Sequence, residues 1–468
     1  MALRIFNTLS DEKEIFSPLT PGMVRMYVCG VTVYDSAHLG HCRFLLTFDV
    51  IFRYLRFSGY DVTYARNFTD VDDKIIKRAN DEGVSCAAIT DRYITEFNRD
   101  GAALELLAPT VEPRATQHIT EIIAIIRQLE AKGLAYSVDG DVYYAVGGFA
   151  SYGKLSGKKI DELEAGARVK VDERKRSPLD FALWKSSKPG EPTWESPWGP
   201  GRPGWHIECS AMSTKYLGQP FDIHGGGRDL IFPHHENEIA QSEGASGQPL
   251  ARYWIHNGFL NINQEKMSKS LGNFFTIREI LESFDATALR HYFLSSHYRS
   301  PMDFSKDGLE EASKATDRIY ETLDRISRVG GAVKSSAPPE PSMIDAFRQE
   351  MDDDFNTPRA LALIFDEVRA LNRLLDEKKH NGLEPRAAGV RSMCDTLGLL
   401  HNGYFERKKE RWLSKSMLTR EQIEKRIAER ELARQAKNWG EADRIRNDLA
   451  ASGAIIEDTP GGAVWKVK

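Results

Sequence analysis

Long hydrophobic runs and closely spaced cysteines are both missing from this chain. No stretch of its 468 residues approaches the ~20 consecutive apolar residues that a membrane-spanning helix needs, so we expect no membrane association. The N-terminal segment carries Asp11, Glu12 and Glu14 and no apolar run, which argues against a signal peptide. Five cysteines scattered singly do not form a disulfide framework. These absences favour a reducing, cytoplasmic environment.

The chain also lacks the overall positive charge that is typical of nucleic-acid-binding proteins, because its formal net charge is −5. The average hides an asymmetry. Residues 406–446 contain thirteen Lys or Arg and eight Asp or Glu, a local charge of +5. Basic segments attract phosphates, although a solvated helix of mixed charge is the alternative on charge alone.

Two short motifs lie more than two hundred residues apart: H-L-G-H at residues 38–41 and K-M-S-K-S at residues 266–270. In the first, Gly40 lets the backbone approach a phosphate, and His38 and His41 can donate hydrogen bonds to it. The second offers two ammonium groups and two hydroxyls to the charge that develops on a triphosphate as it breaks. Either motif alone recurs by chance, but in this order they predict a two-sided nucleotide site.

The order of strands and helices around the first motif predicts the fold. Residues 24–29 alternate as a strand, the H-L-G-H turn follows, and residues 44–57 continue as an apolar helix before a second strand at 61–66. Strand, phosphate-contacting turn and helix form the opening unit of a doubly wound nucleotide-binding fold. We therefore expect an α/β protein with a Rossmann-like parallel sheet.

Local signals predict further elements. Residues 72–82 are expected to form a helix closed by Gly83, and Asp139-Gly140 predicts a hairpin turn between strands at 136–138 and 142–146. Thr357 is expected to cap a helix with Pro358 at its first position. Two more helices are expected at 419–438 and 441–450, followed by a small terminal hairpin that turns at residues 460–462.

The length predicts several domains, because single hydrophobic cores stop growing near ~250 residues. Residues 330–342 are rich in Gly, Pro and small residues and form the clearest linker. We expect a first catalytic half at 1–115, a connective insertion at 116–203, a second catalytic half with the K-M-S-K-S loop at 204–311, a helical bundle at 312–405 and a small mixed α/β domain at 406–468.

Together the two motifs resemble those of class I aminoacyl-tRNA synthetases. Further stretches narrow the resemblance to cysteinyl-tRNA synthetases: T-D-V-D-D-K-I from Thr69, P-G-W-H-I-E-C-S-A-M from Pro203, G-G-G-R-D-L-I-F-P-H-H-E-N-E from Gly225, and the tail around Trp439 and Trp465. The resemblance spans the chain. It implies ATP-dependent ligation of L-cysteine to its tRNA through a cysteinyl-adenylate, by a monomer of the bacterial type with no obligate protein partner.

The resemblance also implies one zinc ion per chain, bound by Cys29, Cys209, His234 and Glu238. The residues themselves show only fragments of this site. His234 and Glu238 are four apart and share a helical face, Cys209 lies in a strand-like run, and Cys29 ends the first strand. Taken singly, each cysteine is more often a small core residue.

Zinc gives a physical reason for selecting a thiol. Serine is nearly isosteric with cysteine, and pocket shape separates such pairs by only ~10². Zinc binds thiolate at ~2.3 Å and lowers the pKa of a bound thiol, so no editing domain is required. We set His235 aside as a ligand, because the residue four positions on is Ile239, which cannot bind a metal.

Other site residues follow from the same resemblance. We expect cysteine to be bound near Cys29, Gly30, Thr69 and Trp205. We expect ATP, with Mg²⁺, to contact Gly40, His224, Gly225, Gly226, Asp229, Met267, Ser268, Lys269 and Ser270. The catalytic set is His38, His41, Lys266 and Lys269. Without the resemblance, a lone Trp205 is more often a core aromatic, and a run of glycines is often a flexible turn.

The tail is expected to bind the tRNA. Arg434, Trp439, Arg444 and Trp465 combine cations with aromatic faces, which suits the unstacked bases of an anticodon loop. In a small terminal domain such aromatics are more often core residues.

Two alternatives remain at this point. A related ligase joins activated cysteine to an amino sugar in thiol biosynthesis and shares the zinc and adenylate sites, but should lack a full basic, tryptophan-bearing tail. A catalytically dead relative acting as an RNA-binding module should have lost one of the motifs, and all of them are intact.

Overall fold

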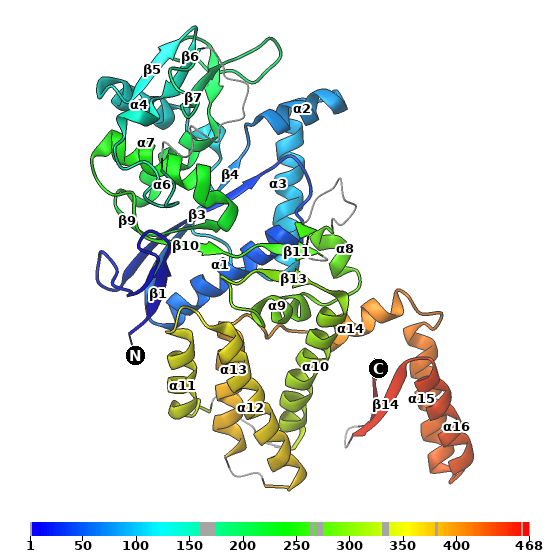
Figure 1. Cartoon of the computed structure of the whole chain (residues 1–468). Helices are drawn as coiled ribbons and strands as arrows, with labels where there is room; N and C mark the ends of the chain where they lie inside the picture. Colours follow the sequence, from blue (N-terminus) through cyan, green and yellow to red (C-terminus); the bar gives the residue numbers. More distant parts are fainter. Residues whose placement is uncertain are drawn as a thin grey trace.

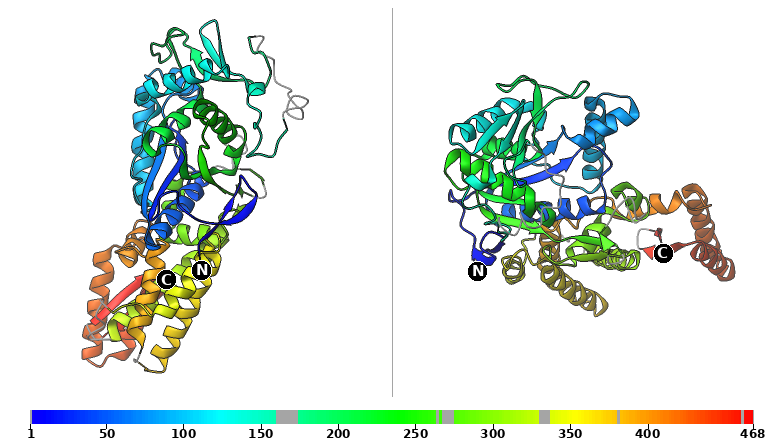
Figure 2. Two further views of the ribbon diagram at one scale, coloured as in Figure 1. Left: turned by 90° about the vertical axis from the view of Figure 1, so that its left-hand side faces the viewer. Right: turned by 45° about the horizontal axis from the view of Figure 1, so that its top comes forward.

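The computed structural model describes residues 2–159, 174–262, 265–266, 275–329, 337–379, 382–459 and 462–467. A central sheet lies in the middle of the molecule, a smaller sheet with its own helices lies above it, and a bundle of helices lies below it (Figure 1). The two views in Figure 2 place the C-terminal elements beside that bundle, at the end of the molecule away from the small sheet.

Four parallel strands form the central sheet in the spatial order β10-β9-β3-β4. They are β3 (Met23–Thr32), β4 (Asp61–Thr69), β9 (Phe221–Gly227) and β10 (Ala251–Asn257). All four are largely buried, as expected for a parallel sheet covered on both faces. The chain leaves this sheet after β4 and returns to it at β9, so a long insertion separates the two halves of the sheet in sequence. The predicted doubly wound, Rossmann-like fold is confirmed.

Helix α1 (Leu39–Phe57) starts directly at the H-L-G-H motif, five residues earlier than the apolar run predicts. Its apolar side chains face the sheet and the neighbouring helices. Helix α2 (Asp73–Glu82) begins at the N-cap Asp72 and ends at Gly83, whose φ of 66° is the left-handed conformation that glycine favours. Both ends of α2 agree with the prediction. Helix α3 (Cys86–Ala103) follows it.

The insertion has a sheet of its own, which the sequence predicts only in part. Asp139 and Gly140 turn the expected hairpin between β5 (Ala135–Val138) and β6 (Asp141–Tyr144). Two further antiparallel strands, β7 (Phe181–Ser186) and β8 (Gly201–Pro203), extend it. Helix α4 (Ile119–Ala131) packs beside this sheet.

The expectation that Cys209 lies in a strand-like run is wrong. Residues 205–217 form helix α6 (Trp205–Leu217), which packs against β3, β4 and helix α7 (Glu236–Ser246). The apolar-polar alternation of a five-residue segment does not separate a strand from a helix that is buried on several sides. The helix brings Cys209 to the carboxyl end of β3.

The remaining elements of the catalytic part are short. They are the β1 (Arg4–Asn7) and β2 (Glu12–Ile15) hairpin, β11 (Leu260–Ile262), β12 (Glu265–Lys266), β13 (Met302–Phe304), α8 (Ile277–Leu281), α9 (Ala286–Leu294), and the single turns η1 (Ala115–Gln117), η2 (Val146–Gly148), η3 (Arg228–Leu230) and η4 (Ile231–His235). The hairpin β1–β2 and the strand β13 have no counterpart in the sequence predictions.

The predicted all-helical part consists of α10 (Lys306–Val329), α11 (Pro341–Met351), α12 (Thr357–Asp376) and α13 (Leu383–Thr396). The N-cap of α12 is Asn356, one residue before the predicted Thr357. Residues 330–336 of the predicted linker lie outside the described residues. In the described part of the chain, no helix is both long and apolar enough to cross a membrane.

Helix α14 (Tyr404–Leu413) leads from the bundle to the C-terminal elements. These are α15 (Arg420–Gln435), α16 (Trp439–Ala451) and the antiparallel strands β14 (Ala454–Thr459) and β15 (Gly462–Val467). The helices and the terminal hairpin agree with the predicted mixed α/β domain. Pro460 and Gly461, predicted to form the turn, lie outside the described residues.

Candidate active site and metal centre

A cavity of about 670 Å³ opens at the carboxyl ends of the parallel strands. Its wall includes Cys29 to Thr32 at the end of β3, Gly227 at the end of β9 and Asn257 at the end of β10. This is the edge at which open α/β sheets bind their ligands. His38, Gly40 and His41 line the same cavity, so the first motif faces it as predicted.

The two histidines of the H-L-G-H motif form one rigid unit at the start of α1. Nδ1 of His38 accepts hydrogen bonds from the backbone N–H groups of Gly40 at 3.1 Å and His41 at 3.3 Å. Nδ1 of His41 accepts one from the backbone N–H of His38 at 3.3 Å, and the rings stack with their centroids 3.7 Å apart.

This geometry fixes the proton on each ring. Burial lowers the pKa of His38 to about 4 and, together with the neighbouring His38, lowers the pKa of His41 well below its usual value. Both rings are therefore neutral near pH 7. Because each Nδ1 accepts a hydrogen bond, the proton of each neutral ring sits on Nε2. The motif thus offers two imidazole N–H donors as well as the backbone N–H groups of a helix N-terminus.

Cys29, which lines the cavity, meets the buried side chains of Cys209, His234 and Glu238, and the possible ligand atoms of the four residues all lie within 4.8 Å of one another. Sγ of Cys29 is 3.2 Å from Oε1 of Glu238 and 3.5 Å from Nε2 of His234, and the last two atoms are 3.0 Å apart. A tetrahedral zinc with bonds of about 2.0–2.3 Å keeps its ligand atoms about 3.3–3.8 Å apart. Two thiols, one imidazole and one carboxylate at these separations therefore fit a zinc ion.

The charges in this buried cluster favour binding a cation. A hydrogen bond from the Cys29 thiol is the main cause that lowers the pKa of Cys209 to about 6, whereas burial raises the pKa of Cys29 well above its usual value. Burial also disfavours the charge on Glu238, but His224 and His234 outweigh it and hold the pKa of this carboxyl well below its usual value. One thiolate and one carboxylate are thus available near neutral pH. Although burial lowers the pKa of His234, Glu238 and Cys209 outweigh it and raise this pKa to about 10, so the imidazole must release its proton when it binds a metal.

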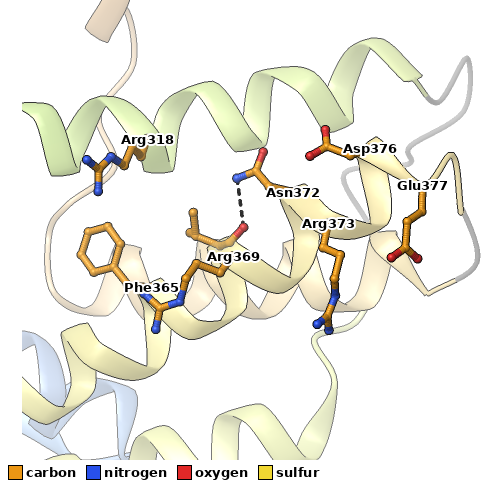
Figure 3. Close-up of a pocket in the computed structure, with 8 residues that line it drawn as sticks. Arg318, Phe365, Arg369, Asn372, Arg373, Asp376 and Glu377 are labelled. Atoms are coloured by element: carbon orange, nitrogen blue, oxygen red, sulfur yellow. Dashed lines mark hydrogen bonds between the residues drawn. The ribbon is translucent and has the colours of Figure 1, made fainter.

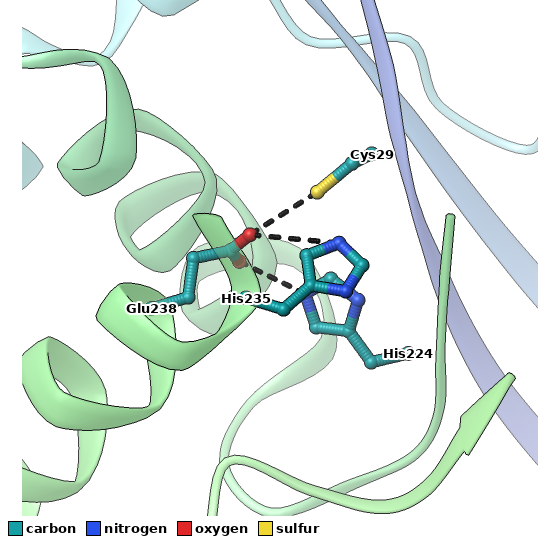
Figure 4. Close-up of side chains that lie close together, drawn as sticks. All are labelled: Cys29, His224, His235 and Glu238. Carbon is teal, nitrogen blue, oxygen red and sulfur yellow. Dashed lines mark hydrogen bonds and ion pairs between the residues drawn. The ribbon is translucent and has the colours of Figure 1, made fainter. Parts of the chain in front are cut away.

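A second group of possible ligands overlaps the first. Figure 4 shows Cys29, His224, His235 and Glu238 converging, and their ligand atoms also lie within 4.8 Å of one another. The spacing argument that set His235 aside considered only Ile239, four positions on, whereas Glu238 lies three positions on, with its Oε1 3.9 Å from Nε2 of His235. Nε2 of His224 lies 2.8 Å from the other oxygen of Glu238, so His224 orients this carboxylate.

Asn67 is a site residue that the sequence reasoning missed. It is buried on β4, and its Oδ1 accepts the backbone N–H of Gly30 at 2.9 Å and lies 3.7 Å from the Cys209 sulfur. Its Nδ2 lies 3.5 Å from Oγ1 of Thr69. One amide thus ties together Gly30, Cys209 and Thr69. Its sequence context gives no clear signal, because Arg66 and Thr69 on the same strand are polar as well.

The two other predicted contacts for cysteine differ in exposure. Trp205 lines the cavity, and its ring stacks on His234 with the centroids 4.3 Å apart, so it sits directly beside the metal cluster. Thr69 is buried beneath the surface of the cavity.

The predicted adenosine edge is only partly matched. Gly227 and Asp229 line the cavity, but His224, Gly225 and Gly226 lie behind its wall and are buried. A Cβ at Gly225 would lie 2.3 Å from the Phe48 ring, and one at Gly226 would lie 2.8 Å from His235. Close internal packing therefore requires glycine at both positions, and their contact with ATP stays a prediction.

Of the K-M-S-K-S motif, only Lys266 belongs to the residues that the structure describes. Lys266 lies on β12, which pairs with β11 next to the cavity. Met267, Ser268, Lys269 and Ser270 lie outside the described residues.

The predicted tRNA contacts in the tail divide into exposed and buried groups. Trp439, at the start of α16, is 59% exposed. Arg434 pairs with Asp458, and Arg444 pairs with Glu441, both at the surface. Trp465 is only 4% exposed and belongs to the core of the terminal domain, where it contacts Trp412. Because Trp465 is a core residue, its ring cannot stack on a base in this conformation.

A second hollow of about 520 Å³ lies between α10 and α12 (Figure 3). Its wall carries Arg318, Arg369 and Arg373 together with acidic and amide side chains. It offers no thiol or imidazole and lies outside the central sheet. The chemistry therefore belongs to the first cavity.

Three family models match successive parts of the chain. Residues 15–314 match the catalytic domain of class I (C) tRNA synthetases, residues 346–401 match a DALR domain, and residues 420–465 match a cysteinyl-tRNA ligase anticodon binding domain. Among curated relatives, the cysteine–tRNA ligases of Geobacter metallireducens and Geobacter sulfurreducens are each 56% identical to this chain, with 100% of both chains covered.

Solved structures agree at the level of the fold. A methionyl-tRNA synthetase of Mycobacterium tuberculosis in complex with methionyl-adenylate superposes with a TM-score of 0.58 at 16% identity, covering 81% of this chain and 90% of that one. A leucyl-tRNA synthetase of Agrobacterium radiobacter in a ternary complex gives 0.59 at 12% identity, with 86% of each chain covered. The chain belongs to the cysteinyl-tRNA synthetase family of class I aminoacyl-tRNA synthetases.

Proposed function

We propose that this chain uses ATP to join L-cysteine to its cognate tRNA through a cysteinyl-adenylate. The observation that carries the proposal is a cluster of two thiols, an imidazole and a carboxylate that adjoins, through Cys29, a cavity also lined by the H-L-G-H motif. A metal site with two sulfur ligands suits an amino acid with a thiol, and the H-L-G-H motif suits a nucleotide phosphate.

Cys29, Cys209, His234 and Glu238 are the residues proposed to hold one zinc ion. Two sulfur donors favour this set over the overlapping group with His224 and His235, because thiolates are the preferred ligands of zinc. In this assignment His224 orients Glu238. When bound, zinc would supply a soft Lewis acid that prefers thiolate to hydroxyl, which separates cysteine from serine.

The first step needs positioning and charge stabilisation more than proton transfer. A carboxylate oxygen of cysteine forms a bond to the α-phosphorus of ATP, and the bond to pyrophosphate breaks. The Nε2–H groups of His38 and His41, which line the cavity at the start of α1, would donate hydrogen bonds to the charge that develops at this centre. Lys266 and Lys269 would neutralise the charge on the leaving pyrophosphate. Mg²⁺ would enter the site bound to the phosphates of ATP.

The second step transfers the cysteinyl group to the tRNA. A ribose hydroxyl of the terminal adenosine attacks the carbonyl carbon, and AMP leaves. The basic tail, residues 406–468, is proposed to bind the anticodon, with Trp439 as the stacking ring and Arg434 and Arg444 as cations. Trp465 supports this domain from within its core.

Charging of purified tRNA tests the proposal. Cysteine-dependent exchange of pyrophosphate into ATP reports only the adenylate, so the decisive assay follows labelled cysteine into tRNA. We expect acid-precipitable cysteinyl-tRNA with the cognate tRNA and none with a non-cognate one. Adenylate formation with transfer to an amino sugar, and no charging of tRNA, would instead identify a ligase of thiol biosynthesis.

A further inference from the structure

Arg43 is a buried cation one turn after the H-L-G-H motif, and only 2% of it is exposed. Its Nη1 donates to the carbonyl oxygen of Phe259 at 2.5 Å. Its Nη2 donates to the carbonyl oxygens of Ser300 and, at 3.4 Å, of Tyr298. The Arg43 side chain thus links α1 to two other segments through hydrogen bonds to their backbone carbonyls.

The partners of this guanidinium are neutral. In the described part of the chain, every hydrogen bond of the Arg43 side chain goes to a carbonyl oxygen, and no carboxylate forms an ion pair with it. Burial lowers the pKa of Arg43 to about 10. Burying a charge without an opposite charge is unfavourable for folding. A neutral residue of similar size would avoid this penalty, so a role beyond core packing is the better explanation.

Of the two segments held by Arg43, residues 298–300 lie behind the other segment, which forms one wall of the nucleotide cavity. Asn257, Gly258, Phe259 and Leu260 line it, and Leu260 begins β11, which pairs with β12 and leads to Lys266. Arg43 therefore connects the helix of the first motif with the strands that carry the second.

Contacts behind the wall hold it in place. The backbone N–H of Gly258 donates to Tyr298 O at 2.8 Å. Tyr298 and Arg299 are fixed from the far side by the buried carboxylate of Asp354, at 2.8 Å and 2.6 Å. A Cβ at Gly258 would lie 2.4 Å from Ser300 O, so there is no room for the wall to come closer. On the side facing α1, Arg43 holds these segments through its hydrogen bonds to Phe259 and Ser300.

We propose that Arg43 is a positioning residue that sets the distance between the H-L-G-H helix and the wall at residues 257–260, and thereby the fit of ATP. This inference rests on the proposed function for its reaction, but not for its binding readout. Arg43 does not line the cavity itself and acts through Phe259 and Ser300.

Arg43→Lys tests the role, because lysine keeps the charge but cannot reach three carbonyls in two segments. We expect the Kd of a non-hydrolysable ATP analogue, measured by calorimetry, and the KM for ATP to rise about 10-fold. We expect kcat of cysteine-dependent pyrophosphate exchange to fall about 10- to 100-fold, as for a misplacement of about 1 Å. The KM for cysteine and the zinc content should not change.

Two further variants make the test specific. Gly258→Ala disturbs the same contact from the other side by its clash with Ser300 O, and should give the same selective loss for ATP. Arg290→Lys is the matched control, because Arg290 is also a fully buried arginine, but it pairs with the Asp49 carboxylate away from the cavity. It should lower thermal stability and leave the affinity for ATP unchanged.

Equal losses for ATP and cysteine, or ATP affinity unchanged in both Arg43→Lys and Gly258→Ala, would overturn the proposal. An Arg43→Lys protein that does not fold would also overturn it, since Arg43 would then be a requirement of the fold. Calorimetric ATP binding needs no cysteine chemistry. If the wild-type protein binds the analogue but shows no cysteine-dependent exchange, the proposed function fails while the inference stands or falls on the Kd values.

Discussion

At the scale of single residues, the close approach of β3 and β4 at Gly30 determines the shape of the candidate site. A Cβ at Gly30 would lie 1.7 Å from the backbone oxygen of Asn67. The same glycine donates its N–H to the Asn67 side chain and follows Cys29, one of the proposed metal ligands. Only a residue without a side chain lets Cys29 and Asn67 take these positions together.

Gly30→Ala should therefore damage both the fold and the metal site. The two strands must separate to admit the methyl group, which we expect to lower the free energy of unfolding by about 3 kcal/mol or more and to reduce zinc content. Gly147→Ala is the control, since Gly147 has open space around its Cβ position and no positive φ. Denaturant unfolding and metal analysis of both variants check this. Equal stability of the two variants would contradict it.

The candidate site could be predicted from sequence only in pieces. His234 and Glu238 are four residues apart, so local spacing placed them on one helical face. Cys29 and Cys209 are brought together by the packing of α6 on β3, which no local pattern encodes, so the resemblance to a family had to supply them. Asn67 went unnoticed because its three partners lie on three different elements, and only the fold reveals them.

Trp439 offers a second test at this scale. Its ring is exposed, and stacking of a base on an aromatic ring contributes about 1–3 kcal/mol. Trp439→Ala should raise the KM for tRNA about 5- to 150-fold with pyrophosphate exchange unchanged. Met417→Ala, at an even more exposed apolar residue of the tail, should change neither. A Trp439→Ala protein that charges tRNA normally would remove this ring from the interface.

At the scale of elements, Asp285 links the catalytic part to the tail. Its Oδ1 caps α9 by accepting the backbone N–H of Thr287 at 3.0 Å. Its Oδ2 accepts from Arg407 at 3.2 Å and from Arg411 at 3.0 Å, both on α14. Since α14 leads to the terminal helices, this buried carboxylate fixes the direction in which the tail leaves the bundle.

Asp285→Asn separates the two roles, because the amide oxygen keeps the cap while the charge that holds the arginines is lost. We expect pyrophosphate exchange to stay near the wild-type level and charging of tRNA, as kcat/KM, to fall about tenfold (~1.4 kcal/mol). Glu406→Gln is the control: its carboxylate, also on α14, pairs with Lys409 and Arg420 but is half-exposed. A parallel loss of both activities in Asp285→Asn would argue for a general defect.

Elements were predictable where local signals agree. The N-cap Asp72 and the C-terminal Gly83 fixed α2, and Asp139-Gly140 fixed the β5–β6 hairpin. Prediction failed where burial overrides a short pattern, as for α6, or where a strand depends on distant partners, as for β7, β8 and β13. Thus the parallel central sheet could be predicted, whereas only the β5–β6 hairpin of the insertion's sheet could be.

At the scale of the whole molecule, buried neutral histidines link stability to pH. Burial lowers the pKa of His291 to about 4, and its Nδ1 lies 3.0 Å from Thr316 Oγ1 between α9 and α10. The unfolded chain takes up this proton near pH 6.5 and the folded chain does so only near pH 4. The folded state therefore loses stability as the pH falls through this window, and the contribution of His291 is complete above it.

His291→Asn, which cannot be protonated, should flatten this dependence. The free energy of unfolding of the wild-type protein should fall more steeply between pH 6.5 and 4, by up to about 1.4 kcal/mol per pH unit for one proton. Urea unfolding of both proteins across this range measures the difference. Parallel curves would show that His291 does not titrate as its burial indicates.

Selection of a thiol by a bound metal is the property on which the proposed function depends, and one ratio tests it. The rates of pyrophosphate exchange with cysteine and with serine are compared before metal removal, after chelation, and after zinc is returned. We expect exchange with cysteine to collapse on chelation, the preference over serine to fall at least about 100-fold, and both to recover with zinc. A metal-free protein that still prefers cysteine by the original factor would contradict the account.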